Sequence, residues 1–229
     1  MLILRWILRA TFWLSFTLLI GTFAVVLCLR WVDPPGSAMI IAWEMESGRS
    51  ATHIWQPFEK LSPQLQIAVI ASEDQKFLEH FGFDFQSIKS ALTENKGRLR
   101  GASTISQQVA KNLFLWNGRS YLRKAFEAWY TLLIEMLWTK QRILEIYLNI
   151  AEFGEGVYGA QAAAQIFFGN SSYDLDARQS ALLAAVLPNP KNMLAARPSD
   201  YVSKRATDIV KMVWQMGGPS YIKKLDESY

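Results

Sequence analysis

The sequence predicts a mainly α-helical domain preceded by one N-terminal transmembrane helix. Residues 10–29 form a run of twenty side chains without a charge. From Leu61 onward apolar residues recur with helical spacing, and we find neither an internal repeat nor an alternation of strands with helices. A chain of 229 residues has room for one sizeable domain and an appendage.

The composition excludes several classes of protein. With 51% hydrophobic residues, nine Trp and thirteen Phe, the chain is too apolar to be disordered. A net charge of +4 suits an anionic membrane surface or a phosphate-bearing substrate and is too weak to indicate nucleic acid as a partner. The one cysteine, Cys28, excludes an intramolecular disulfide.

The apolar N-terminal run is long enough to cross a bilayer. Twenty helical residues span about 30 Å, which matches the hydrocarbon core. Arg5 and Arg9 precede the run, so the positive-inside rule places residues 1–9 in the cytoplasm and exports the rest. We interpret residues 10–30 as an uncleaved signal-anchor. A cleaved signal peptide is the alternative, but the run is long and lacks a small-x-small site.

The remaining elements follow in order. Residues 31–60 are expected to be a linker segment, in which "SAMIIAWEMESGRS" forms a short strand or extended chain. The main helical domain is expected over residues 61–218 and a C-terminal tail over 219–229. Ser62-Pro63 is a typical helix start before the apolar residues 65–70.

Further helices are predicted from their caps and breakers. A second helix is expected over 84–95, followed by a basic glycine-containing loop over 96–103. The other predicted helices cover residues 103–115 with Ser103 or Thr104 as cap, 120–138, 140–154 stopped by Gly154 and Gly156, 177–190 ended by two prolines, and 200–218 closing on Gly-Gly.

The stretch "ASEDQKFLEHFGFD" raises the first question of chemistry. If it is helical, Glu73, Phe77 and His80 stand on one face, beside Asp74. A carboxylate on the same face as a phenyl ring is expected to be partly buried, which raises its pKa and suits it to proton transfer. The alternative is a solvent-facing charge pair on an ordinary amphipathic helix.

Two further polar clusters lie on predicted helices. In "GASTISQQVAKN" one face carries Ser103, Gln107 and Lys111, and the adjacent stripe carries Thr104, Gln108 and Asn112. Polar side chains this dense are costly in a helical core unless they are paired or wet.

The third cluster, "RSYLRKAFE", is rich in cations. Arg119, Arg123 and Lys124, together with Lys111, are suited to clamping a pyrophosphate. Glu73 and Glu127 are two separated carboxylates that suit proton transfer and positioning at a sugar. Alternatively, Arg123 and Glu127 form a routine helical ion pair.

Other site types lack their motifs. The sequence has no phosphate-binding Gly-x-x-x-x-Gly-Lys-Ser/Thr loop and no His-Glu-x-x-His. With only His53, His80 and Cys28 as soft ligands, no protein-held metal site is expected.

The motifs together resemble one family. "EDQKFLEHFG" looks like the first motif of the peptidoglycan glycosyltransferases, glycosyltransferase family 51. "GASTISQQVAKN", "RKAFEAWYTLLIE" and "KQRILEIYLN" resemble the second, third and fourth, and "GVYGAQAAAQIFFG" and "ALLAAVLPNP" fall where the last motifs belong. The resemblance runs from about Leu61 to Pro198. The chain departs from the common pattern at Thr131, Asn170 and Gln179.

This resemblance implies a lysozyme-like helical glycosyltransferase domain of the monofunctional kind. It implies that lipid II is polymerised into β-1,4-linked glycan with inversion and with release of undecaprenyl pyrophosphate. Glu73 would be the general base, and Glu127 would orient cations or the donor sugar. Asp74, Phe77 and His80 would support the site. The expected substrate and pyrophosphate contacts are Ser103, Thr104, Gln107, Gln108, Lys111, Asn112, Arg119, Arg123 and Lys124.

The resemblance also implies a setting. The enzyme would lie in the bacterial inner membrane with its catalytic domain on the periplasmic face. Its partners would be lipid II, the growing lipid-linked glycan, membrane lipid and proteins of cell division or elongation. No cofactor is required, although a divalent cation (Mg²⁺ or Mn²⁺) can bridge the substrate pyrophosphate.

Two alternative functions stay open at this point. A glycan-cleaving, lysozyme-like enzyme could use a glutamate in a helical domain, but it has no need of a cationic pyrophosphate clamp. A non-catalytic membrane-anchored scaffold would not need both glutamates.

The placement of one segment is also open. Residues 112–122, rich in aromatic side chains, either pack in the core or form a surface that enters the headgroup layer.

Overall fold

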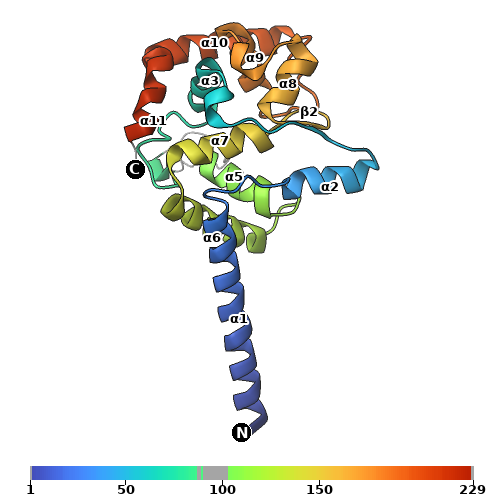
Figure 1. Ribbon diagram of the computed structural model, residues 1–229, viewed down its shortest axis with the longest axis vertical. Helices are drawn as coiled ribbons and strands as arrows, with labels where there is room; N and C mark the ends of the chain where they lie inside the picture. Colours follow the sequence, from blue (N-terminus) through green and yellow to red (C-terminus); the bar gives the residue numbers. More distant parts are fainter. Residues whose placement is uncertain (1, 87–88, 90–102, 228–229) are drawn as a thin grey trace.

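The computed structural model describes residues 2–86, 89 and 103–227. It confirms a mainly helical domain with one long apolar helix at its N-terminus, α1 (Leu2–Cys28), which projects away from the domain (Figure 1). Ile3–Cys28 is long and apolar enough to cross a membrane, and only 6% of its most apolar window is buried. All of the predicted charge-free run except Leu29 lies inside this helix, which also includes Arg5 and Arg9.

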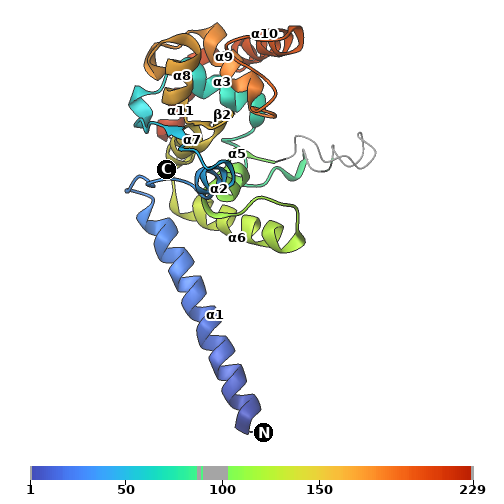
Figure 2. The same cartoon turned by 90° about the vertical axis from the view of Figure 1, so that its right-hand side faces the viewer.

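The helices of the domain form two groups. Helix α3 (Pro63–Glu73) packs on α9 (Ala177–Val186) and α10 (Asp200–Gln215), while α5 (Ile105–Phe114) packs on α6 (Tyr121–Leu137) and α7 (Lys140–Ile150). Helix α6 lies beside the inner end of α1 in both views (Figures 1 and 2). The shorter helices are η1 (Phe58–Lys60), α8 (Ala160–Phe168), η2 (Ser172–Asp174), η3 (Gly218–Ile222) and α11 (Lys223–Glu227).

Side-chain caps fix where the helices begin. The hydroxyl of Ser62 accepts the N–H of Gln64, and Pro63 occupies the first turn of α3, as predicted. Of the two candidate caps of α5, Thr104 is the one used. Its hydroxyl accepts the N–H of Gln107 while the Gln107 side chain accepts the N–H of Thr104, which makes a reciprocal capping box.

The prediction of a strand or extended chain after the Pro-Pro-Gly sequence is wrong, because Ala38–Ser47 forms helix α2. Ser37 caps its N-terminus by accepting the N–H of Ile40, and Gly48 ends it in the left-handed conformation. Ile40 and Trp43 are buried against Tyr158, and this packing favours the helix. The domain boundaries themselves stay predictions.

Two helices end earlier than the pattern predicts. Helix α3 stops at Glu73, so Glu73, Phe77 and His80 do not share a helical face. Helix α7 stops at Ile150, before the glycines that were expected to end it. The chain then forms a small sheet of order β1-β3-β2, from Thr52–His53, Val157–Tyr158 and Glu152–Gly154, which the sequence pattern did not reveal.

The remaining predicted elements agree in part. Helix α9 is followed by Pro188 and Pro190, and α10 by Gly217 and Gly218, as expected. Most of the helix predicted over 84–95 and of the loop over 96–103 lies outside the described residues.

One buried core joins both groups of helices. Its largest fully buried side chains are Tyr147, Phe77, Phe153, Leu61, Leu65, Ile67, Ile70, Ile105, Ile134, Ile143, Leu144 and Ile146. Because α3, α5 and α7 all contribute to this core, the polar residues at their exposed edges are held in fixed positions relative to one another.

Candidate functional site

Glu73 occupies the last position of α3, facing α5 and α10. Its Oε2 accepts a hydrogen bond of 3.0 Å from Nε2 of Gln108, and its Oε1 lies 3.7 Å from a guanidinium nitrogen of Arg205. Burial raises the pKa of Glu73, whereas Gln108, Arg205 and Lys111 oppose the rise. Glu73 is therefore a half-buried carboxylate with a hydrogen-bond donor and cations beside it.

A hydrogen-bonded chain fixes the orientation of the Gln108 amide. The hydroxyl of the buried Tyr147 donates to Oε1 of Gln108 at 3.2 Å, which leaves the amide nitrogen to face Glu73. Tyr147 belongs to the fourth motif, but sequence reasoning did not single it out. Its position within "EIYLN" was the available signal.

Asp74 and His80 support the Glu73 segment. The Asp74 carboxylate accepts the backbone N–H of Ile105 at 2.9 Å, at the start of α5, and its other oxygen lies 2.9 Å from Nε2 of His80. An anion at a helix N-terminus is stabilised by the free N–H groups there. Asp74 thus ties the end of α3 to α5, the helix that carries Gln108.

Phe77 is fully buried beneath this turn. The ammonium of Lys140 lies 4.7 Å from the centre of its ring and donates to the carbonyl of His80 at 2.8 Å. The carboxylate of Glu135 accepts from Lys140 and also from the hydroxyl of Ser106. This buried network fixes the turn after Glu73 from behind.

Glu127 is buried within the third motif and holds two cations. It accepts a hydrogen bond of 3.0 Å from Arg123 and a second from Lys124. Nε of Arg123 is also buried and has no hydrogen-bond partner within the described residues. The paired cations leave donor capacity for an anionic ligand.

The charge of Lys111 interacts with the carboxylates of both Glu127 and Glu73. Burial lowers its pKa, while the carboxylates of Glu127 and Glu73 raise it and the cations of Arg123 and Lys124 lower it. Lys111 has no carboxylate within 4 Å in the part of the chain that the structure describes. An incompletely neutralised buried ammonium is suited to binding an anion.

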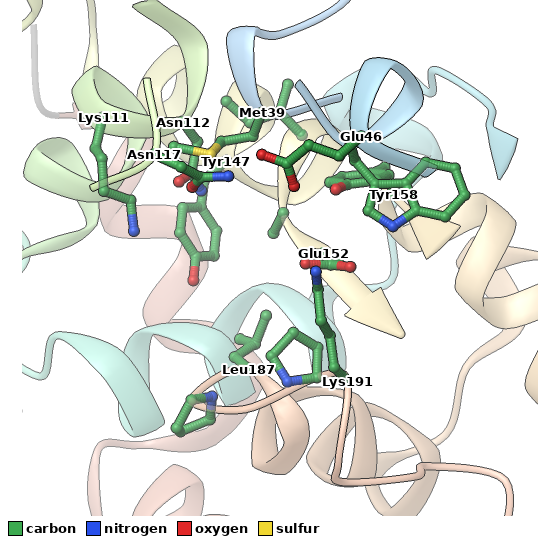
Figure 3. A pocket seen from close by; sticks show the side chains of 15 residues that line it. Met39, Glu46, Lys111, Asn112, Asn117, Tyr147, Glu152, Tyr158, Leu187 and Lys191 are labelled. Carbon is green, nitrogen blue, oxygen red and sulfur yellow. The ribbon is translucent and has the colours of Figure 1, made fainter. Parts of the chain in front are cut away.

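A cavity of about 280 Å³ opens beside Lys111 (Figure 3). Lys111 and the Tyr147 hydroxyl lie at one side, while Glu46 of α2, Glu152 and Lys191 reach toward it from the others. Asn112 also lines it. Helix α2, which was expected to be linker, therefore forms part of the wall of this cavity.

The other predicted contacts are placed less uniformly. Thr104 and Gln107 are buried and cap α5, so their polar groups are already used within the protein. Ser103 and Arg119 are exposed. The structure brings Gln108, Lys111, Arg123 and Lys124 to the glutamates, and it adds Arg205, which lies beyond the predicted motifs.

The sequence departures are accommodated locally. Thr131 is fully buried and its hydroxyl donates to the Glu127 carbonyl at 2.7 Å. Asn170 donates to Gln179 at 3.3 Å, and Gln179 also completes a capping box with Asp176. Two of the three departures thus contact each other, away from the glutamates.

Residues 112–122 answer neither alternative uniformly. Leu113 and Leu115 are buried, and the ring of Phe114 stacks on Tyr130 at 4.3 Å. Trp116 and Tyr121, in contrast, are 48% and 97% exposed. The first part of the segment is core, and the second part is surface.

Comparisons with known proteins give the family to which the chain is similar. The sequence model described as Transglycosylase matches residues 40–213. The chain is 52% identical over 233 residues to the biosynthetic peptidoglycan transglycosylase of Pseudomonas syringae pv. syringae (strain B728a), covering 99% of this chain and 97% of the relative. The protein of the same name from Pseudomonas putida (strain W619) is similar to the same extent.

Proposed function

The chain belongs to the transglycosylase family, and we propose that it polymerises lipid II into β-1,4-linked glycan at the outer face of the cytoplasmic membrane. It is a peptidoglycan glycosyltransferase of cell-wall synthesis, as its relatives are named. The observation that carries the finer proposal is the arrangement of Glu73. A half-buried carboxylate with a raised pKa interacts with Lys111, whose charge also interacts with Glu127 and the two cations that Glu127 holds.

In the proposed reaction Glu73 is the general base. It removes the proton from the 4-hydroxyl of the acceptor GlcNAc as that oxygen attacks the anomeric carbon of the donor MurNAc. The bond between this carbon and the pyrophosphate oxygen breaks, and its electron pair leaves with undecaprenyl pyrophosphate. Attack from the opposite face inverts the configuration and gives a β-link.

The cations act on the leaving group. In this proposal Lys111, Lys124 and the exposed Arg119 neutralise the charge that develops on the pyrophosphate. Glu127 holds Arg123 and Lys124 in position by accepting from both. Gln108 lies between the proposed base and the cations that act on the leaving group, because it contacts Glu73 and is one turn from Lys111 on α5.

A divalent cation would arrive with the substrate. Within residues 2–86, 89 and 103–227 no group of three or more His, Cys, Asp or Glu side chains is arranged to hold a metal. We propose that Mg²⁺ or Mn²⁺ would be held by the substrate pyrophosphate rather than by protein side chains, and would neutralise part of its charge. Titration of polymerisation with EDTA and back-addition of each metal tests this, and an EDTA-resistant rate would argue for the side-chain cations alone.

The proposed setting follows from α1. The helix would span the inner membrane once, with Arg5 and Arg9 on the cytoplasmic side and the domain in the periplasm. Proteins of cell division or elongation are proposed partners of this setting.

The direct test is polymerisation of lipid II by the full-length protein, wild type beside Glu73→Gln. Removal of a general base should reduce the rate by roughly 10²–10⁴-fold. Glu59→Gln, which alters an exposed carboxylate on η1, is the matched control and should retain full activity. Equal rates for wild type and Glu73→Gln would exclude Glu73 as the base.

A digestion assay separates the alternatives. Preformed glycan is incubated with the same protein, and the products are sized. Cleavage without polymer would favour the lytic alternative, and absence of both activities would favour a scaffold.

A further inference from the structure

The C-terminal end of α1 and the residues just after it are bound to the domain by hydrogen bonds to their carbonyl groups. The indole N–H of Trp138 donates to the carbonyl of Val26 at 2.7 Å. Arg142 donates twice to the carbonyl of Leu29, at 3.1 and 3.2 Å, and once to that of Val32 at 2.9 Å. The last carbonyls of a helix lack intrahelical donors and carry partial negative charge, so a guanidinium is well suited to this position.

Arg142 is nearly buried and fully engaged by its neighbours. Its side chain is 11% exposed, and its Nη1 lies 2.9 Å from carboxylate oxygens of both Asp33 and Glu145. The guanidinium also lies 5.7 Å from the ring centre of Trp55. Every nitrogen of the fork therefore has a partner, and three of the partners, Leu29, Val32 and Asp33, lie on the segment that follows α1.

The contact continues along the side of α1. Val26 is fully buried in the domain core, and the indole N–H of Trp129 donates to the hydroxyl of Thr22 at 3.2 Å. Trp129 belongs to α6, which packs on α1 (Figures 1 and 2). The junction between membrane helix and domain is thus packed and hydrogen-bonded rather than a free linker.

The same helix that holds α1 also reaches the base. Arg142 and Tyr147 both lie on α7, whose intervening residues Ile143, Leu144 and Ile146 are fully buried. Tyr147 donates to Gln108, and Gln108 donates to Glu73. A short rigid path therefore connects the end of the membrane helix to the catalytic carboxylate.

The surface beside the junction is apolar. Leu122, Leu132 and Met136 of α6 are 63%, 40% and 65% exposed, and Trp31, just beyond α1, is 70% exposed. Exposed tryptophan and apolar side chains favour the boundary between headgroups and acyl chains.

From these observations we infer that α1 is a rigid mount that sets the height of the catalytic cleft above the bilayer, with Arg142 as its positioning residue. This inference rests on the proposed function, because a lipid-linked substrate presents its pyrophosphate at a fixed depth. A cleft held at that depth meets the substrate in one orientation, whereas a cleft on a flexible tether samples many depths. Loss of alignment by about 1 Å can cost ~10²-fold in rate.

The test measures rigidity and activity separately, with the full-length protein in lipid vesicles. Nitroxide labels are attached to Cys28, the one cysteine of the sequence, and to Gln215→Cys at the exposed end of α10. Pulsed electron–electron resonance then gives the distance distribution between them. We expect a narrow distribution in the otherwise wild-type protein and one at least about twice as wide in Arg142→Met.

Activity is measured on unlabelled proteins with lipid II in the same vesicles. Arg142→Met should raise KM for lipid II by about tenfold with a smaller change in kcat, and Arg142→Lys should fall between it and the wild type because it keeps the charge but loses the fork. Arg197→Met, at an exposed arginine far from α1 in the sequence, is the control and should match the wild type.

A second variant guards against misfolding of the domain. Thr22→Val combined with Asp33→Ala removes two acceptors that lie on α1 or just after it and leaves every residue of the domain unchanged. This double variant should broaden the distance distribution and raise KM, as Arg142→Met does. Distributions as narrow as the wild type in both variants, or broad ones with unchanged KM, would overturn the inference. A wild type that makes no polymer would remove the proposed function and the positioning role with it, while the distance data would still decide whether the mount is rigid.

Discussion

Replacement of Gln108 by Met should move the acid side of the pH–rate profile to higher pH. The amide of Gln108 donates to Glu73 at 3.0 Å and stabilises its ionised form, which opposes the effect of burial on the pKa. Methionine is similar in size but cannot donate this bond. The proposed base works only when ionised, so we expect activity to be lost as the pH falls through the pKa of Glu73, and Gln108→Met should raise that pKa further.

The size of the effect follows from the bond that is lost. A hydrogen bond to a charged group contributes about 1.5–3 kcal/mol, and 1.4 kcal/mol corresponds to a factor of about ten. At a pH on the acid limb the ionised fraction of Glu73 should therefore fall by roughly 10–100-fold. At high pH, where Glu73 is ionised in both proteins, the two rates should converge except for any loss in substrate binding.

The assay is initial-rate polymerisation of lipid II over a pH series at saturating substrate. Gln75→Met is the control, because Gln75 lies two residues from Glu73 and its amide donates instead to the Ala71 carbonyl and Met212. It should reproduce the wild-type profile. An acid limb of Gln108→Met that coincides with that of the wild type, whatever its maximum rate, would refute the assignment of Gln108 as the residue that stabilises ionised Glu73.

Three further predictions use other contacts. Arg205→Gln removes the charge 3.7 Å from Glu73 and should shift the acid limb of the pH–rate profile to higher pH, as Gln108→Met does. The shift should be smaller, because the Arg205 side chain is 29% exposed and its charge is screened by water. The same pH series measures this shift, and a shift to lower pH would contradict the prediction. Glu73→Gln should have a higher Tm than the wild type at pH 8, and the difference should vanish near pH 4. Burial raises the pKa of Glu73, so its ionisation costs stability as the pH rises. Thermal scans at the two pH values test this, and a lower Tm of the variant at pH 8 would contradict it. Gly82→Ala should lower Tm by about 2–8 °C, because Gly82 has φ +77° and an added Cβ would stand 2.7 Å from Cγ2 of Thr131. An unchanged Tm would contradict this strain.

Local signals were sufficient for most of the helical framework. The charge-free run of α1, the Ser62-Pro63 start of α3 and the prolines after α9 are each encoded in a few adjacent residues. Such signals act through the backbone of the same segment, so they can be interpreted without knowledge of the fold. The four motifs were found for the same reason, since each occupies one continuous stretch.

Elements stabilised by distant contacts were missed. Helix α2 depends on burial of Ile40 and Trp43 against Tyr158, more than a hundred residues away. The pairing of Thr52 with Val157 likewise requires a contact between remote segments. Arg205 reaches Glu73 only because α10 packs on α3, and nothing in its own neighbourhood in the sequence indicates that contact.

The second motif shows why helical periodicity alone could not separate chemistry from scaffold. Its residues were assigned to two stripes of one substrate-binding surface, yet the structure divides them differently. Thr104 and Gln107 cap α5, and Ser106 donates to Glu135 inside the core. Among the buried or half-buried polar side chains that the structure describes in this motif, Gln108 and Lys111 are the two that interact with Glu73. The inward-facing residues fix where α5 begins and how it is rotated about its axis. This rotation directs Gln108 toward Glu73, the proposed base. Substitutions on the buried side of α5 should therefore reduce activity by displacing Gln108, although they remove none of the proposed reacting groups.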